Sequence, residues 1–207
     1  MLNVAVLCSK RAPGLTGLLA RRNDSFDVSC IVTTHDDAVV EAPGIPVISH
    51  PIRAYDDRRT YDVMTLHVLR ELGVDAVLLL GYLYVVTDVL LSRFPQRVFN
   101  IHDSDLTIKR PDGERKYVGL HSTRDAILRG ERETRSTLHV VTEKLDGGPI
   151  LSLSPPFPVA PWVHDAVAAG QRDIVKAYAY AQREWMMRST WGEMAARVFA
   201  AQELVAA

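Results

Sequence analysis

The chain has 207 residues, of which 47% are apolar and 24% are charged, and its formal net charge is -1. This length suits one large hydrophobic core, so we predict a single domain over residues 1–207. The near-neutral charge predicts no nucleic-acid or membrane partner, and no apolar run reaches the roughly 18 residues of a membrane span. Cys8 and Cys30 lie in apolar segments and no secretion signal opens the chain, so we expect a reducing, cytoplasmic setting.

The first half of the chain alternates between apolar, strand-like runs and amphipathic, helix-like segments. Near-continuous apolar runs are typical of strands that are buried on both faces. The predicted strands are 2–8, 28–33, 46–49, 75–81 and 97–101, and the predicted helices run from 15 to the break at Asn23-Asp24, over 58–72 and over 87–93. This order predicts a three-layer α/β fold with a doubly wound, mostly parallel, Rossmann-like sheet.

The second half of the chain departs from this alternation. A polar excursion over 103–117 is followed by a short helix over 122–128 and by strands over 137–141 and 150–154. Four prolines between 155 and 161 predict a rigid extended crossing, and the periodic segment 165–206 predicts one long helix or two.

Polar side chains follow several of the predicted parallel strands, at the edge where such sheets bind ligands. Asn100 and His102 end the strand 97–101, while the segments 9–11 and 82–84 follow two other strands. We therefore expect three separate segments to meet at one edge and to form a site.

An amide, an imidazole and a carboxylate form the sharpest candidate set, namely Asn100, His102 and Asp146. When an amine attacks a carbonyl, negative charge builds on oxygen, and the amide and imidazole are suitable donors to it. A carboxylate beside the imidazole can accept the amine proton. These residues predict an acyl- or formyl-transfer site. The structural alternative is that Asn100 and His102 are caps and that Asp146 belongs to an ordinary turn with the two glycines after it.

The loop after the first strand, which contains Ser9, Lys10, Arg11 and Gly14, has no dinucleotide or nucleoside-triphosphate motif. Its two cations could hold an anion at the start of the next helix, or they could be solvated loop residues.

Two other kinds of site are predicted to be absent. The metal-ligand types His102, Asp103, Asp105, His121 and Asp146 lack a ligand spacing, so we predict no metal. No nucleophile elbow of a hydrolase is present. His67 and His139, which lie within a predicted helix and a predicted strand, are expected to be structural.

Three blocks of the sequence resemble a known family. Asn100-Ile101-His102, the segment 116–121 and the segment 140–150 are similar to folate-dependent formyltransferases, most of all to glycinamide ribonucleotide transformylases. The likeness runs in order from the first strand to about Leu153. It implies that Asn100 and His102 hold the formyl group of 10-formyltetrahydrofolate and that Asp146 assists proton transfer.

The resemblance also implies where the two substrates bind. The pterin ring would lie between the loop after the fourth strand and the loop before Asp146, against Leu83, Tyr84, Val85, Val86, Val141 and Leu145. The candidates for binding the acceptor are Ser9, Lys10, Arg11, Gly14 and His121.

The chain departs from the family pattern on the acceptor side. Lys10 to Gly14 replaces the family's phosphate-binding Gly-Asn-Gly-Ser-Asn type loop, Asp103 replaces the usual Pro, and Val118 stands where Pro is common. The segment 103–117 is longer than expected and would be a lid, a dimer contact or a longer turn.

We expect formyl transfer to a primary amine of a small anionic metabolite, with glycinamide ribonucleotide as the first candidate. The alternatives are hydrolysis of 10-formyltetrahydrofolate, formylation of an amino sugar, and a non-catalytic relative that binds folate. A homodimer is left open.

Overall fold

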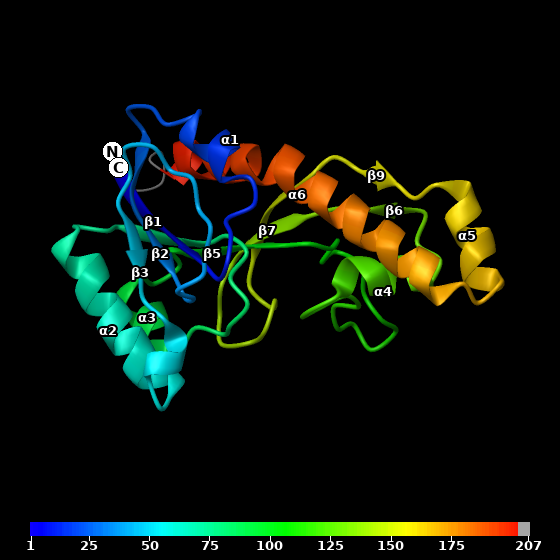
Figure 1. Ribbon diagram of the computed structural model, residues 1–207, viewed down its shortest axis with the longest axis horizontal. Helices are drawn as coiled ribbons and strands as arrows, with labels where there is room; N and C mark the ends of the chain where they lie inside the picture. The colour runs from blue at the N-terminus through cyan, green and yellow to red at the C-terminus, as the bar shows by residue number, and fades with distance from the viewer. Residues whose placement is uncertain (203–207) are drawn as a thin grey trace.

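The computed structural model describes residues 1–202, and its centre is a seven-stranded sheet with the order β3-β2-β1-β4-β5-β7-β8 (Figure 1). These strands are β1 (Leu2–Cys8), β2 (Phe26–Thr33), β3 (Val47–Ser49), β4 (Ala76–Leu79), β5 (Val98–His102), β7 (Thr137–Val140) and β8 (Ile150–Leu153). The first five pair in parallel, whereas β7 is antiparallel to both of its neighbours. The predicted mostly parallel, doubly wound sheet is confirmed.

Helices cover both faces of the sheet and complete the predicted three layers (Figure 1). One face packs against α2 (Arg58–Glu71) and α3 (Asp88–Arg93), and the other against α1 (Leu15–Leu19) and α6 (Arg172–Gln202). Successive strand residues point to opposite faces. Val4 and Val6 therefore enter the core under α1 and α6, while Ala5 and Leu7 enter the core under α2 and α3.

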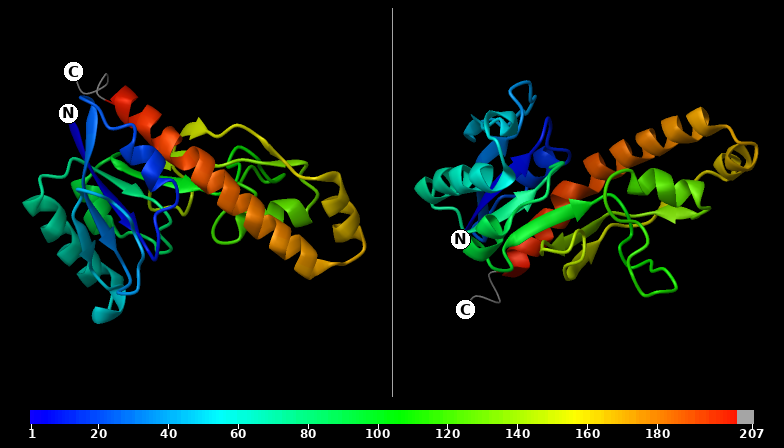
Figure 2. Two further views of the ribbon diagram at one scale, coloured as in Figure 1. Left: turned by 45° about the horizontal axis from the view of Figure 1, so that its top comes forward. Right: turned by 90° about the horizontal axis from the view of Figure 1, so that it is seen from below.

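A third, smaller apolar cluster lies beside the main sheet. It joins α4 (Ser122–Leu128), α5 (Pro161–Ala168) and the first turns of α6 through Ile127, Val163 and Val175. Two short strands, β6 (Glu133–Thr134) and β9 (Phe157–Pro158), form a separate pair in this part of the molecule. The long α6 connects this cluster with the main core (Figure 2).

The C-terminal segment differs from its prediction at Pro161 and agrees with it in the periodic part, where two helices were one of the two predicted outcomes. Pro161 is not part of an extended crossing but the first residue of α5, a position that suits proline because the missing N–H has no helical partner there. The periodic segment forms two helices, α5 and α6, with a break at Gly170, whose φ is +70°. The predicted helix end near residue 206 lies outside the described residues.

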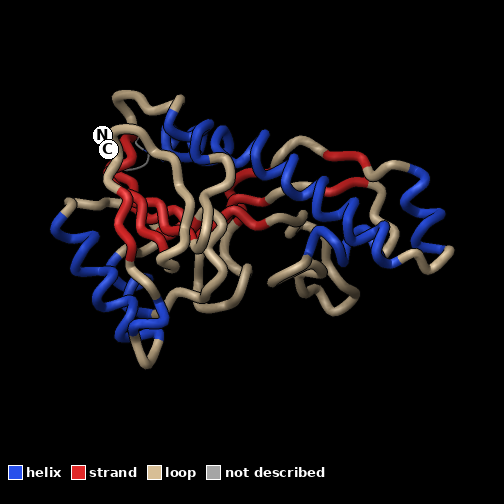
Figure 3. The backbone as a smooth tube through the Cα atoms, viewed as in Figure 1, coloured by secondary structure: helices blue, strands red, loops and turns tan. Residues whose placement is uncertain are grey.

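The loops of the sheet carry most of the remaining chain. The segment from residue 103 to 121 runs as a loop between β5 and α4 (Figure 3).

Cys8 and Cys30 are free thiols in the core, and burial raises their pKa values to about 12 and about 11. Within residues 1–202, no helix is long and apolar enough to cross a membrane.

The crossing of α1 and α6 depends on two glycines. A Cβ on Gly192 would lie 2.3 Å from the Gly14 carbonyl oxygen and 2.4 Å from the Leu18 nitrogen, so the helices approach through bare backbone. Gly14 itself has a φ of +82°. It therefore serves packing and chain direction as the residue before α1.

Gly192→Ala should destabilise the protein, although alanine favours a helix. Overpacking at such a contact costs about 2–3 kcal/mol, which outweighs the roughly 1 kcal/mol gained in helix propensity. Urea denaturation would measure the free energy of unfolding. Gly44→Ala is the control because that position has a positive φ and open space, and strain alone should cost about 1 kcal/mol. A Gly192→Ala protein as stable as the wild type would contradict the proposed packing.

Candidate active site

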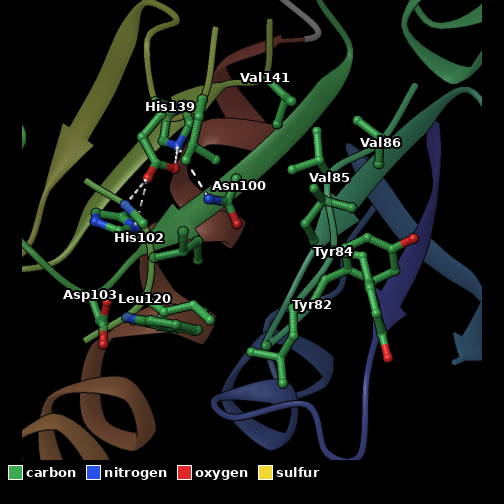
Figure 4. Close-up of a pocket in the computed structure, with 18 of the residues that line it drawn as sticks. Tyr82, Tyr84, Val85, Val86, Asn100, His102, Asp103, Leu120, His139 and Val141 are labelled. Atoms are coloured by element: carbon green, nitrogen blue, oxygen red, sulfur yellow. Dashed lines mark hydrogen bonds and ion pairs between the residues drawn. The ribbon is translucent and has the colours of Figure 1, made fainter. Parts of the chain in front are cut away.

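A cavity of about 330 Å³ opens where β4 and β5 end. Most of the site residues that the sequence predicted lie on its walls. Figure 4 shows Asn100, His102 and His139 on one wall, with Tyr84 and Val85 facing them across the space. The predicted residues that line it are Asn100, His102, Asp146, Leu83, Tyr84, Val85, Val86, Val141, Leu145 and His121.

Each ring nitrogen of His102 has a neighbour in the site. Nε2 lies 3.0 Å from the Tyr117 carbonyl oxygen, to which it donates, and Nδ1 lies 3.5 Å from Oδ2 of Asp146. The hydroxyl of Ser104 also donates to the Tyr117 carbonyl, at 2.7 Å. Because His102 is the last residue of β5, the sheet and the 103–121 loop together fix its imidazole beside the carboxylate.

The carboxylate of Asp146 is presented by a tight turn. Its own φ is +48°, a left-handed value that is uncommon outside glycine. Gly119 donates its N–H to Oδ2 at 2.7 Å. A Cβ on Gly148 would lie 1.9 Å from the Val140 carbonyl oxygen, so only glycine allows the turn to pack on the end of β7. Gly148 is therefore required by the backbone of this site.

Burial raises the pKa of Asp146, but the imidazoles of His139 and His102 and the N–H of Gly119 lower it more, to about 2. The carboxylate is therefore ionised at neutral pH although it is buried. A charged acceptor for a proton is in place inside the cavity.

Asn100 has a partner that we predicted to be structural, namely His139. The two residues pair directly across β5 and β7, and the Asn100 amide nitrogen lies 3.2 Å from Nε2 of His139. Nδ1 of His139 lies 2.9 Å from the Val140 carbonyl and donates to it, which leaves Nε2 to accept from Asn100. One N–H of the Asn100 amide is thus engaged, and the other is available to a carbonyl oxygen in the cavity. His139 orients Asn100, a role that only the strand pairing reveals.

The opposite wall is apolar and partly open. Leu83 and Val85 are 53% and 59% exposed, and Leu145 is 53% exposed, which is unusual for large apolar side chains that lie close together. The hydroxyl of Ser9 accepts the N–H of Leu83 at 3.0 Å and so fixes this loop. Ser9 is buried, and its observed contact is structural.

The two cations of the first loop lie apart from the cavity. Lys10 pairs with Asp37 at 2.7 Å on the surface, and Arg11 pairs through both Nη atoms with the carboxylate of Glu184 on α6. Neither cation lines the cavity. The predicted anion site at Lys10, Arg11 and Gly14 is therefore not brought together with the predicted catalytic residues.

A different cation, Arg183, lines the cavity and was not predicted. Its Nε donates to Oδ2 of Asp103, whose Oδ1 accepts from the Ser122 hydroxyl at 2.7 Å. Burial raises the pKa of Asp103, but the charges of His102 and Arg183 outweigh it and the net shift is downward. Arg183 lies in a periodic helix, where its sequence position alone gives no sign of a cavity contact.

In residues 1–202 no group of three or more His, Cys, Asp or Glu side chains is arranged so that it could hold a metal ion.

Comparison with known proteins identifies the family. The pattern of the family described as formyl transferase matches residues 2–172, well over half of the chain. The chain belongs to the formyl transferase family. This confirms the resemblance of the sequence blocks around Asn100 and Asp146.

Relatives in this family have two different names. Phosphoribosylglycinamide formyltransferase of Escherichia coli (strain K12) is 35% identical over 98 residues, which cover 47% of this chain and 42% of that protein. Formyltetrahydrofolate deformylase of Bacillus subtilis (strain 168) is 30% identical over 154 residues, or 72% of this chain and 48% of that protein. The match thus spans less than half the length of either relative.

Solved structures of the formyl transferase family share the fold. The crystal structure of glycinamide ribonucleotide transformylase 1 from Symbiobacterium toebii is 26% identical, with a TM-score of 0.68. The match covers 93% of this chain and 88% of that one. The predicted α/β architecture is confirmed by this likeness.

Asp146→Asn should remove a pH-dependent part of the stability. The pKa of Asp146 lies at about 2, below its ordinary value of 3.8. The ionised carboxylate therefore stabilises the fold above about pH 4 by about 2 kcal/mol, and this is lost as the pH falls toward 2. Urea denaturation at several pH values would give the difference in unfolding free energy between the two proteins. A difference that stays constant across this window would contradict the lowered pKa.

Proposed function

We propose that this protein transfers a formyl group from 10-formyltetrahydrofolate to a primary amine of a small anionic metabolite. The observation that carries the proposal is the convergence of Asn100, His102 and Asp146 on one cavity, opposite an apolar wall. That wall, formed by Leu83, Val85 and neighbouring residues, suits a flat pterin ring, and backbone groups of the same loops can satisfy the polar edge of the ring.

The site residues divide the reaction among them. The acceptor nitrogen attacks the formyl carbon, the bond from that carbon to N10 of the folate breaks, and tetrahydrofolate leaves with a proton on N10. The free N–H of Asn100 and Nδ1 of His102, which lies 3.5 Å from Asp146 and so has room for a closer acceptor, donate to the oxyanion that forms on the way. Asp146, already ionised, accepts the proton that the amine loses, directly or through water, and the same proton then passes to N10 of the leaving folate.

The anionic character of the acceptor is inferred from Arg183 rather than from the first loop. Arg183 is the cation that lines the cavity beside His102 and Asp103, and its side chain is 29% exposed. Its Nε is occupied by Asp103, while its Nη edge can present paired donors to a phosphate or carboxylate. Glycinamide ribonucleotide is the first candidate acceptor, and an amino sugar that carries a phosphate is the second.

Hydrolysis of 10-formyltetrahydrofolate is the competing function. It would use the same three residues with water in place of the amine, and the deformylase relatives favour it. Tetrahydrofolate release with and without candidate amines separates the two functions. Release that needs an amine supports the transferase, whereas equal release of formate without any amine would replace it with the hydrolase.

His102→Ala should lower kcat by about a hundredfold or more, because one donor to the developing oxyanion is lost. Tetrahydrofolate release would be followed spectroscopically. His67→Ala is the matched control, since His67 is exposed on α2 and does not line the cavity. Equal kcat values for both variants and the wild type would remove His102 from the mechanism.

Arg183→Gln should raise KM for an anionic acceptor about tenfold, with a smaller effect on KM for the folate, because a charge-assisted contact is lost. Arg183→Lys keeps the charge beside the buried Asp103 and should show a smaller increase. Arg188→Gln is the control, as it lies on the same helix, is 74% exposed and contacts Glu184 but does not line the cavity. A KM for the acceptor that is unchanged in both Arg183 variants would contradict the assignment.

A further inference from the structure

The long segment after β5 folds into a hairpin-like loop with an ordered base. Lys109 and Arg115 form an antiparallel bridge, the N–H of Arg110 donates to the Glu114 carbonyl at 2.8 Å, and Gly113 turns the chain with a φ of +83°. The tip over 111–114 is exposed. The backbone hydrogen bonds at its base already close the hairpin. The contacts that its side chains make with other segments therefore serve another purpose.

Two adjacent side chains of this hairpin grip the turn that carries Asp146. The guanidinium of Arg115 donates from Nη1 to the backbone carbonyl of Asp146 and from Nη2 to that of Gly148, the latter at 2.7 Å. Next to it, Glu114 accepts from the Lys144 ammonium at 2.5 Å. The hairpin thus contacts the turn at three points over residues 144–148.

Arg115 suits this task for a physical reason. Its planar fork fixes the directions of both donors, so two carbonyls two residues apart are held at a set distance and angle. The Asp146 backbone has a φ of +48°, a conformation that costs of order 1–2 kcal/mol for a residue other than glycine. The flanking Gly147 and Gly148 add freedom to the turn rather than stiffness. An external clamp is therefore what keeps this peptide in place.

The same stretch of chain also holds the two side chains that face each other in the site. Along residues 115–119, every second residue makes one contact: Arg115 holds the Asp146 backbone, the Tyr117 carbonyl accepts from His102, and the Gly119 N–H donates to the Asp146 carboxylate. One short segment thus sets the position of the imidazole and of the carboxylate relative to each other.

We propose that Arg115 is a positioning residue that holds the Asp146 carboxylate in its reactive orientation, assisted by the Glu114–Lys144 ion pair. The inference rests on the proposed function of Asp146. It assigns the segment 103–117 to the clamp of the catalytic turn, where the sequence left a lid, a dimer contact or a longer turn.

Arg115→Ala should lower kcat roughly tenfold to a hundredfold, because a misplacement of about 1 Å at a reacting group has that effect. KM for the folate should change less than kcat, since Leu83 and Val85 lie on another loop and only Leu145 of the apolar wall belongs to the turn. Arg115→Lys, which can bridge only one carbonyl well, should recover part of the loss. Arg110→Ala is the matched control because Arg110 lies in the same hairpin and its side chain forms an ion pair with Asp112 rather than with the turn 144–148. It should behave as the wild type does.

A double-variant cycle separates positioning from a general structural effect. In the Asp146→Asn background, Arg115→Ala should cause little further loss of kcat, because the carboxylate that it positions is already gone. The acid limb of the kcat profile should also move to higher pH in Arg115→Ala, as the contacts that lower the pKa of Asp146 weaken. Losses that multiply in the double variant, with an unmoved pH profile, would overturn the assignment.

Amide hydrogen exchange tests the clamp without any activity. Exchange over residues 144–149 should speed up in Arg115→Ala but not in Arg110→Ala, whereas exchange in β1 and β4 should stay slow in both. Wild-type exchange rates in Arg115→Ala would refute the clamp even in a protein with full activity. If the wild-type protein releases tetrahydrofolate neither with an amine nor with water as the acceptor, the proposed function is refuted. The exchange rates then still decide whether Arg115 holds the turn.

Discussion

The buried negative charge of Asp146 is the constraint around which the site is organised. Removing a carboxylate from water is costly, and the charge persists only because donors surround it. The backbone N–H of Gly119 donates to it, and the imidazoles of His102 and His139 lie 3.5 and 3.6 Å from its oxygens. These three neighbours come from different segments, namely the 103–121 loop, β5 and β7. The ionised carboxylate therefore requires the whole edge of the sheet to be assembled before the site can exist.

Much of the fold was predictable because its signals are local. The apolar run over residues 2–8 and the periodicity of 58–72 depend only on neighbours in sequence, and both elements lie where they were predicted. Asn100, His102 and Asp146 were predicted from their residue types and motif context, and they line one cavity. The position of Asn100 and His102 follows from the rule that parallel strands expose their carboxyl ends at one edge, whereas Asp146 reaches the cavity from the turn between the antiparallel strands β7 and β8.

The residues that were missed act through pairings that a single sequence does not reveal. His139 looks like any polar residue in a strand, and its role follows from lying opposite Asn100 in antiparallel register. Arg183 looks like a solvated residue on a periodic helix, yet α6 crosses the sheet so that its side chain reaches Asp103. Pro161 was predicted to lie in an extended crossing, although the first turn of a helix accepts proline.

Two departures from the family pattern, Asp103 and the altered first loop, both contact α6. Asp103 stands where the family has Pro, and it is balanced by Arg183 on α6. Arg11, in the altered first loop, binds Glu184, the next residue on the same helix, and Glu184 also lies 3.7 Å from Arg183. Alternating charges thus run from the first loop through α6 to the residue after His102. Loss of Arg183 would leave the buried carboxylate of Asp103 without its cation, whereas Glu184 is shared by Arg11, Arg183 and Arg188. Under the proposed function, the choice of acceptor would therefore depend on α6 as well as on the first loop.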